Sequence, residues 1–295
     1  MQMHLSGRPI DEVALDVLRN PLPGFRQDGV PYFVAYSGGK DSCVILDLAK
    51  RSGVPFEAHY HYTPLDPPEL RAFIREQIKI PANHLTIDPP ERSLKSMGRE
   101  KQFMPRAGAR WCCQLFKEKR SPPGVTTILG VRWAEGNKRA SRSTFERRRS
   151  GGGKVINPIV GWETVDVWQY IRERGLSYCA LYDEDWPRLG CVLCPLARNP
   201  TPLAQEKARR QMARWPQITR IWRMVSREIW TTGGKGARRF SSEEAMWQSW
   251  LLAARSREAK DDGECGLFGP PVELADDLGE TRTLAASICA ASSTA

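Results

Sequence analysis

The sequence predicts an α/β fold with a mostly parallel, Rossmann-like sheet, helices on both faces and a helical extension after the sheet. Three observations predict this class. Runs of β-forming residues alternate with segments of helical periodicity. Two glycines directly follow the first of these runs, as in a strand–turn–helix unit. After Pro202 the chain has a helical character and is rich in arginine and tryptophan.

The individual elements follow in order along the chain. The first strand segment is rich in β-formers, and the segment after the glycines has apolar residues at helical spacing. Strands are expected over 31–36, 54–60, 84–87 and 125–131, and helices over 42–51, 68–79 and 163–174. This alternation is typical of parallel strands that are covered by helices.

Composition divides the chain into four regions. We expect an N-terminal helical lead-in, a main α/β domain, a helical region rich in arginine and tryptophan, and an acidic flexible tail, over residues 1–27, 28–200, 201–258 and 259–295. The last boundary is placed where glycine, proline, acidic and small residues begin to dominate.

The net charge of +10 is unevenly distributed. Residues 261–295 hold seven acidic and one basic side chain, a balance of −6, so the rest of the chain carries +16. Such a surplus suits a polyanionic partner such as nucleic acid, although nucleotide-binding enzymes can also be basic. The sequence has no run of about eighteen apolar residues and no apolar signal-peptide core. We therefore expect a cytoplasmic protein with no membrane partner.

The glycine turn after the first strand reads Ser37-Gly38-Gly39-Lys40-Asp41-Ser42. Glycines let backbone amides approach phosphate oxygens, and the helix that follows directs its positive end to the same place. Lys40 adds a full charge, and the two serines can donate hydrogen bonds. The pattern predicts an anion site; the alternative is an ordinary turn with Asp41 as helix N-cap.

This turn differs from a Walker A loop, because Asp41 rather than Ser or Thr follows the lysine. It resembles the PP-loop of the ATP pyrophosphatase superfamily. That resemblance implies ATP with Mg²⁺ as substrate, cleavage between the α- and β-phosphates, and pyrophosphate bound at the turn. It also implies catalytic roles for Lys40 and Asp41.

Four of the eight cysteines form a pattern: Cys112 and Cys113 are adjacent, and Cys191 and Cys194 follow after 77 residues. Thiolates suit zinc or iron–sulfur clusters, and adjacent cysteines are less usual for zinc. An iron–sulfur cluster is favoured over two alternatives, a zinc site and unligated thiols. Of the other cysteines, Cys43 and Cys179 are expected in the core and Cys289 in the tail.

Several further motifs resemble the phosphoadenosine-phosphosulfate (PAPS) reductase-like family of the PP-loop superfamily. They are Arg110-Trp111-Cys112-Cys113, Gly130-Val131-Arg132-Trp133-Ala134-Glu135, Asn157-Pro158-Ile159 and Gly190-Cys191-Val192-Leu193-Cys194-Pro195. The resemblance covers roughly residues 28–200. It implies that Cys112, Cys113, Cys191 and Cys194 hold a 4Fe–4S cluster, and that Arg132, Arg139 and Arg142 face the nucleotide.

Three other features allow two interpretations each. Asp66 follows a strand, at the end of the sheet where ligands are expected to bind. It either contacts the nucleotide or magnesium, or caps the next helix. Residues 138–154 hold seven basic residues against one glutamate. Within this segment, Arg147–Arg149 and the glycines after them form either a flexible rim, as the resemblance implies, or a solvated basic loop. The tryptophans of residues 215–250 stack bases or pack helices, and packing is favoured.

The favoured function resembles that of the sulfurtransferase component of bacterial DNA phosphorothioation systems. ATP activates an acceptor oxygen by adenylation, and sulfur then displaces AMP. The implied partners are a nucleic acid, with DNA favoured and tRNA thiolation possible, and a cysteine desulfurase or another sulfur donor. The sequence leaves the oligomeric state open. A third class of function is a non-catalytic module that binds nucleotide or nucleic acid.

The main alternative is an assimilatory sulfonucleotide reductase, which carries its nucleophile in a Glu-Cys-Gly-Ile/Leu-His motif. This chain has Glu264-Cys265-Gly266-Leu267-Phe268, 71 residues after Cys194 and within the acidic tail. Acidic neighbours raise a thiol pKa, which disfavours a nucleophilic role. The loop at 63–68 also lacks the Asp-Thr-Gly-like turn of the reductases. Sulfur insertion is therefore the favoured interpretation.

Overall fold

A computed structural model describes residues 3–4, 6–26, 28–117, 121–147, 153–197 and 200–252, with only the backbone of Lys138. The expected acidic tail and the thiols of Cys265 and Cys289 lie outside these described residues. No helix in the described part of the chain has the length and apolar character needed to cross a membrane.

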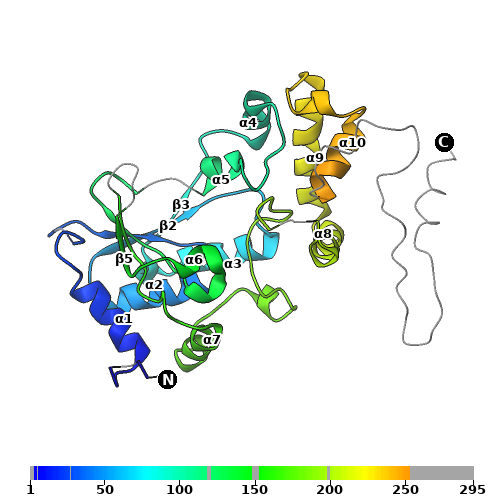
Figure 1. Ribbon diagram of the computed structural model, residues 1–295. Helices are drawn as coiled ribbons and strands as arrows, with labels where there is room; N and C mark the ends of the chain where they lie inside the picture. The colour runs from blue at the N-terminus through cyan, green and yellow to red at the C-terminus, as the bar shows by residue number, and fades with distance from the viewer. Residues whose placement is uncertain are drawn as a thin grey trace, which may run out of the picture.

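The centre of the fold is a six-stranded sheet in the order β3-β2-β1-β4-β6-β5 (Figure 1). The strands are β1 (Tyr32–Ala35), β2 (Phe56–His61), β3 (Leu85–Asp88), β4 (Thr126–Ile128), β5 (Phe145–Arg147) and β6 (Lys154–Ile156). All neighbouring pairs are parallel except β5 and β6, which are antiparallel. The predicted α/β class with a mostly parallel sheet is confirmed.

The central position of β1 creates a crevice at the carboxyl ends of the parallel strands. In the register of the sheet, Val34 of β1 lies between Ala58 of β2 and Ile128 of β4, and all three are fully buried. The chain leaves β1 toward β2 on one side, whereas β4 is added on the other side. The connections after β1 and β4 therefore diverge, which is where open α/β sheets bind ligands.

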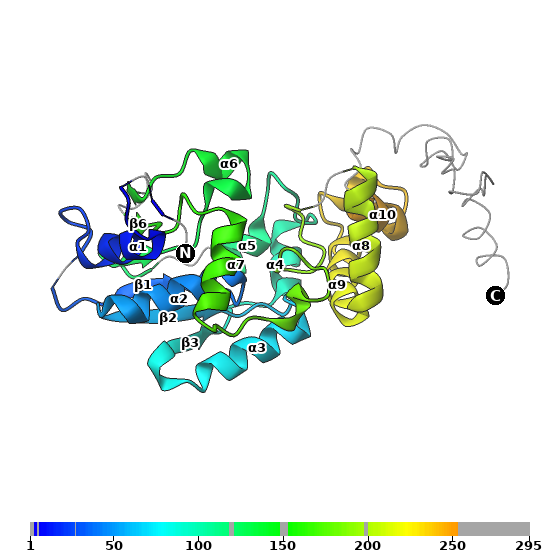
Figure 2. The same cartoon turned by 90° about the horizontal axis from the view of Figure 1, so that it is seen from below.

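Helices lie on both sides of the sheet (Figures 1 and 2). In Figure 1 those below it are α1 (Ile10–Arg19), α2 (Lys40–Ser52), α3 (Pro68–Ile78) and α7 (Thr164–Glu173). On the other side are α4 (Leu94–Lys101) and α5 (Trp111–Phe116). The remaining short elements are α6 (Asn137–Ala140) and the 3-10 helices η1 (Pro81–Asn83), η2 (Trp133–Glu135), η3 (Ala180–Tyr182) and η4 (Ala237–Arg239).

The helical extension predicted after Pro202 is present as α8 (Pro202–Arg214), α9 (Pro216–Thr231) and α10 (Glu243–Leu252). It packs against the main domain through α4 and α9, which lie side by side in both views (Figures 1 and 2). Gly98 makes this close approach possible, because a Cβ there would lie 2.9 Å from the Val225 side chain. Trp222 and Trp250 are buried with ring centroids 5.0 Å apart, so they pack helices as predicted.

The rim predicted at Arg147–Arg149 and the glycines lies largely outside the described residues, because residues 148–152 are not among them. The described residues on either side form β5 and β6, which the sequence did not predict. Pairing across the sheet and an edge contact of Phe145 with Phe25, with centroids 5.1 Å apart, hold β5 in place. Both stabilising interactions depend on tertiary structure, so local composition does not reveal them.

Candidate nucleotide site and cysteine cavity

The glycine turn lies at the carboxyl end of β1, in the crevice of the sheet. Gly38 has a φ of +72°, and a Cβ there would lie 2.7 Å from Ile74 and 2.8 Å from Leu70. The left-handed conformation and the close approach of α3 therefore both require glycine at this position. The turn brings the start of α2, at Lys40, to the crevice at the carboxyl end of β1.

Two hydroxyl groups fix the shape of the turn. Ser42 donates a hydrogen bond to the Gly39 carbonyl at 2.8 Å and accepts one from the Ser37 amide at 3.2 Å. The Ser37 hydroxyl in turn donates to the Ser42 hydroxyl at 3.3 Å. These bonds hold the first amides of α2 at the crevice, where the helix presents a partial positive charge.

Asp41 links the glycine turn to the loop after β4. Its carboxylate lies 3.2 Å from Lys40 Nζ and 2.6 Å from Arg132 Nε. Arg132 is 1% exposed and also donates to the Trp162 carbonyl at 3.1 Å. Gly130 lets the loop approach, since a Cβ there would lie 3.1 Å from the Asp41 carbonyl oxygen. The buried guanidinium thus has partners that compensate for its lost hydration.

A cleft of about 350 Å³ opens between the ends of β1 and β4. Its charged lining consists of four cations and two anions: Lys40, Arg132, Arg139, Arg188, Asp41 and Glu135. Ser37, Gly39 and Ser42 line the same cleft. Cationic side chains and helix amides around one cleft form a site suited to a polyphosphate.

The other predicted nucleotide contacts have different positions. Arg139 lines the cleft and is paired with Glu135. Arg142 is paired with Glu146 at 2.9 Å and is not among the described residues that line the cleft. Gly38 shapes the turn without lining the cleft.

Asp66 is 1% exposed and is not among the described residues that line the cleft. Tyr60 donates a hydrogen bond to one carboxylate oxygen at 2.9 Å, and Lys117 donates to the other at 3.0 Å. The next helix, α3, has no side-chain cap at its N-terminus. Asp66 therefore connects β2 with the end of α5 in this structure.

Tyr182 and Arg188 also line the cleft, and sequence reasoning missed both. The Tyr182 hydroxyl accepts a hydrogen bond from the Lys40 amide at 2.9 Å, across 142 residues of sequence. Burial raises the pKa of Tyr182, which remains a neutral phenol. No local pattern marks this tyrosine, whereas the closeness of Arg188 to Cys191 in the sequence is a signal that could have identified it.

The four cysteines of the predicted cluster line one small cavity. Cys112 and Cys113 come from α5, and Cys191 and Cys194 come from the loop before α8. Three hydrogen bonds position that loop: Val192 N to Leu65 O at 2.8 Å, Leu193 N to Gln211 Oε1 at 2.9 Å, and Trp222 Nε1 to Val192 O at 3.0 Å. The loop is thus held from the sheet side and from α8 and α9.

The thiols disfavour one another's ionisation. A hydrogen bond with Cys113, in which Cys112 keeps its proton, and burial raise the pKa of Cys112, and burial raises the pKa of Cys191. Four converging thiols from two segments match the donor set of a four-iron cluster, which would stabilise them as thiolates. The cavity that they line has a volume of about 10 Å³. Among the described residues, no three His, Cys, Asp or Glu side chains are placed to bind a single metal ion.

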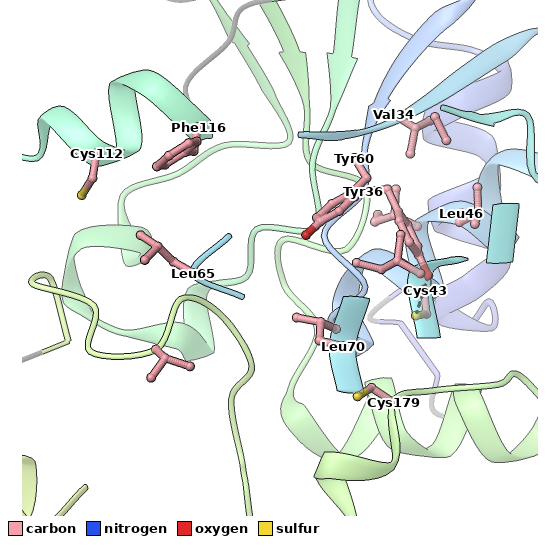
Figure 3. Packing of buried hydrophobic residues seen from close by; sticks show 14 of the residues in the cluster. Val34, Tyr36, Cys43, Leu46, Tyr60, Leu65, Leu70, Cys112, Phe116 and Cys179 are labelled. Carbon is pink, nitrogen blue, oxygen red and sulfur yellow. Dashed lines mark hydrogen bonds between the residues drawn. The ribbon is translucent and has the colours of Figure 1, made fainter. Parts of the chain in front are cut away.

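Cys43 and Cys179 are core residues, as predicted. Both are buried, and the Cys43 sulfur lies 3.5 Å from the Tyr36 hydroxyl behind the glycine turn. Figure 3 shows Cys43, Tyr36 and Cys179 together on one side of this region, whereas Cys112 lies apart near Phe116 and Leu65. Burial raises the pKa of Cys43 to about 12, so it is a thiol at neutral pH.

One chain segment joins the cleft to the cysteine cavity. Residues 187–189 line the cleft, and Cys191 and Cys194, a few residues further along, line the cavity. A shift of this segment can therefore affect both places.

Residues 31–197 match the model of the phosphoadenosine phosphosulfate reductase domain family. An uncharacterized protein of Methanocaldococcus jannaschii is 31% identical over 198 residues, which are 64% of this chain and 47% of that protein. Adenosine 5'-phosphosulfate reductase 2 of Bacillus subtilis is 28% identical over 223 residues, 68% of this chain and 86% of that protein. The chain thus spans about half the length of the archaeal relative.

Among solved structures, the chain is similar to phosphoadenylyl-sulfate reductase from Candida auris in complex with phosphate. The identity is 19% and the TM-score 0.45, with 65% of this chain and 97% of that chain covered.

Proposed function

The chain belongs to the phosphoadenosine phosphosulfate reductase domain family, and from this premise we propose that it is a PP-loop enzyme that cleaves ATP to activate an acceptor for sulfur insertion. The acceptor is most simply an oxygen of DNA, as in phosphorothioation. The sulfur comes from a cysteine desulfurase or another donor protein. The proposal combines the family membership with the chemistry of the cleft.

The observation that carries the proposal is the position of Asp41 between Lys40 and Arg132 at the cleft. The carboxylate holds both cations at the start of α2, 3.2 Å from Lys40 Nζ and 2.6 Å from Arg132 Nε. Positive groups fixed before the reaction stabilise charge that develops during it. Arg139 and Arg188 add two further cations to the lining of the cleft. This arrangement suits ATP with Mg²⁺, whose triphosphate brings several negative charges.

In the proposed reaction the acceptor oxygen attacks the α-phosphorus of ATP. The bond from that phosphorus to the bridging oxygen breaks, and pyrophosphate leaves with the electron pair. Lys40 and the first amides of α2 neutralise the charge on the leaving group. A sulfur nucleophile then displaces AMP from the adenylated acceptor. Asp41 positions Lys40 and Arg132 for the first step.

Cys112, Cys113, Cys191 and Cys194 would hold a 4Fe–4S cluster. When bound, such a cluster supplies sulfur or electron chemistry next to the nucleotide. The chain's own contribution is to hold the loop that carries Cys191 and Cys194 through hydrogen bonds with Leu65, Gln211 and Trp222. Support for a cluster near the nucleotide is that residues 187–189 line the cleft, whereas Cys191 and Cys194, just after them, line the cysteine cavity.

The test is release of pyrophosphate and AMP from ATP by anaerobically purified full-length protein, with and without DNA. We expect Lys40→Ala and Asp41→Asn to reduce this release at least about 100-fold, because the first removes the cation that neutralises the leaving group and the second removes the carboxylate that holds Lys40 and Arg132 in place. Lys79→Ala is the matched control, since Lys79 is an exposed residue next to α3 that pairs with Glu76. Turnover of Lys40→Ala and Asp41→Asn at the wild-type rate would refute the proposal.

A second candidate is a sulfonucleotide reductase. The similarity to the adenosine 5'-phosphosulfate reductase of B. subtilis favours it, as does the Glu264-Cys265-Gly266-Leu267 match, which lies outside the described residues. In that reaction a thiolate attacks the sulfur of adenylyl sulfate and AMP leaves. A second thiol, from a dithiol reductant, then attacks the S-sulfonate, forming a disulfide and releasing sulfite.

Sulfite release from adenylyl sulfate and from its 3′-phosphorylated form separates the two candidates. Under sulfur insertion, Cys265→Ser leaves pyrophosphate release from ATP unchanged, and no sulfite forms. Sulfite release that disappears in Cys265→Ser would establish the reductase instead.

A further inference from the structure

A groove of about 390 Å³ runs between α4 and α9. Its lining consists of Lys95, Arg220, Arg223, Met224, Arg227, Glu228 and Thr231. All of these except Lys95 belong to α9, which follows the part of the chain that matches the family. Four of the side chains are cations and one is an anion, which gives the groove a net charge of +3. The mechanism proposed above uses none of them.

The arginines of α9 form a stripe along one side of the helix. Arg220, Arg223 and Arg227 follow one another at three- and four-residue spacing, so they share a face. The opposite face of α9, with Trp222, is buried against the rest of the protein. The stripe therefore faces outward.

Two of these arginines have no salt-bridge partner among the described residues. Arg220 and Arg227 are exposed, and the ion pairs of the described part of the chain include neither. Arg223, by contrast, is paired with Glu243 at 2.8 Å. Exposed guanidinium groups at the two ends of the stripe can bind phosphate oxygens with both of their terminal nitrogens.

The acidic residue of the groove is already neutralised. Glu228 accepts a hydrogen bond from Arg99 at 2.6 Å and pairs with Lys95 at 3.2 Å, both from α4. These cations hold the pKa of Glu228 below its ordinary value. Glu228 thus fastens α4 to α9 and does not cancel the charge of the arginine stripe.

The groove lies directly behind the cysteine cavity. Trp222 lines that cavity and donates to the Val192 carbonyl of the cysteine loop, and its neighbour Arg223 lines the groove. An α-helix with its side chains is about 10–12 Å across. A ligand on the arginine stripe is therefore one helix width from the four thiols.

We propose that the groove between α4 and α9 binds the phosphate backbone of double-stranded DNA. The identity of this ligand as the sulfur acceptor rests on the proposed function; the binding site rests on the charges of the groove. The stripe from Arg220 to Arg227 extends about 10 Å along the helix. Each strand of duplex DNA carries one charge per about 3.4 Å, so about three phosphate charges of the nearer strand lie along the stripe.

The test is binding of a short fluorescent DNA duplex to the full-length protein, followed by anisotropy at several salt concentrations. The double variant Arg220→Glu/Arg227→Glu is expected to bind at least about tenfold more weakly, with the slope of log Kd against log salt reduced by about two. The matched control Arg75→Glu/Arg172→Glu makes the same change in net charge at exposed sites on α3 and α7. It is expected to bind like the wild type.

Three outcomes would overturn the proposal. One is equal affinity and salt slope in the wild type and the groove variant; another is equal weakening in the control. The third is tighter binding of a tRNA than of the duplex by the wild-type groove. Without DNA, where water attacks the α-phosphorus in place of the acceptor, the groove variant is expected to release pyrophosphate from ATP at the wild-type rate. If the groove variant loses DNA binding but neither it nor the wild type releases pyrophosphate, the DNA site in the groove is supported and the proposed function is refuted.

Discussion

Gly38 has two separate reasons to be glycine. Its backbone has a φ of +72°, and the space where a Cβ would lie is occupied by Ile74 and Leu70. The first reason concerns the conformation of the turn, and the second concerns the contact between the turn and α3. A comparison with another glycine can separate them.

Gly38→Ala is expected to lower the free energy of unfolding by about 1–2 kcal/mol for the left-handed backbone and by about 1–3 kcal/mol for the steric contact. Gly53 has a φ of +71°, and no atom lies within 4 Å of the place that a Cβ would occupy, so Gly53→Ala has only the first cost. Urea unfolding of both variants measures the difference. Equal losses in the two variants would contradict the steric argument.

At this scale the sequence predicted the local part of the site. Ser37, Gly39, Lys40, Asp41 and Ser42 are consecutive or nearly so, and all line the cleft. The partners that complete the site are distant in sequence: Arg132 reaches Asp41 across 91 residues and Tyr182 reaches Lys40 across 142. The family motif pointed to the arginine, but no motif marked the tyrosine.

Among the elements, α2 connects the site most directly to the core, since ten of its thirteen residues are buried. Cys43 lies on this helix against Tyr36, directly behind the glycine turn. The packing of α2 against β1 thus includes a thiol whose ionisation would place a charge in the core.

The stability of the fold should depend on pH through Cys43. Burial raises its pKa to about 12, against about 8.5 for an unfolded thiol. As pH rises past that lower value, the unfolded chain loses its proton first. The contribution of the Cys43 thiol to the free energy of unfolding is therefore full below about pH 8.5. It declines toward pH 12, by up to about 1.4 kcal/mol per pH unit.

Urea unfolding at about pH 8 and about pH 10 measures this decline, with Cys43→Ala as the comparison. The difference in unfolding free energy between wild type and variant should shrink by about 2 kcal/mol over this interval. A difference that stays constant would mean that Cys43 ionises normally in the folded protein. Because the other titrating groups are the same in both proteins, their effects on the unfolding free energy cancel in this difference.

The sequence predicted elements with strong local patterns and missed those defined by contacts. The expected strand at 54–60 is present as β2 and the helix at 163–174 as α7. In contrast, α4 and the pair β5 and β6 were not expected. Helix α4 contains Gly98, a poor helix former, because that glycine allows close packing on Val225 of α9.

For the whole molecule, the cysteine cavity depends on three parts of the fold. The cysteines come from α5 and from the loop before α8, and Trp222 of α9 closes the cavity. The sequence spacing suggested four ligands but could not show that the helical extension takes part. The gathering of the thiols is a product of tertiary structure.

Anaerobically purified protein is expected to contain about four irons and four sulfides per chain if these thiols hold the proposed cluster. Cys112→Ala and Cys194→Ala should lose most of this iron and its visible absorbance, because each removes a ligand. Cys179→Ala is the matched control at a buried cysteine of the core. Full iron content in both cavity variants would contradict the cluster assignment.

The spacing of the cysteine pairs has a consequence for biosynthesis. Cys113 and Cys191 are separated by 77 residues, and ribosomes add about 5–20 residues per second. A nascent chain therefore presents its first two thiols for about 4–15 s before the second pair is made. Trp222, which closes the cavity, is translated later still. During this interval the adjacent pair lacks its final partners, so its thiols are open to oxidants and foreign metals.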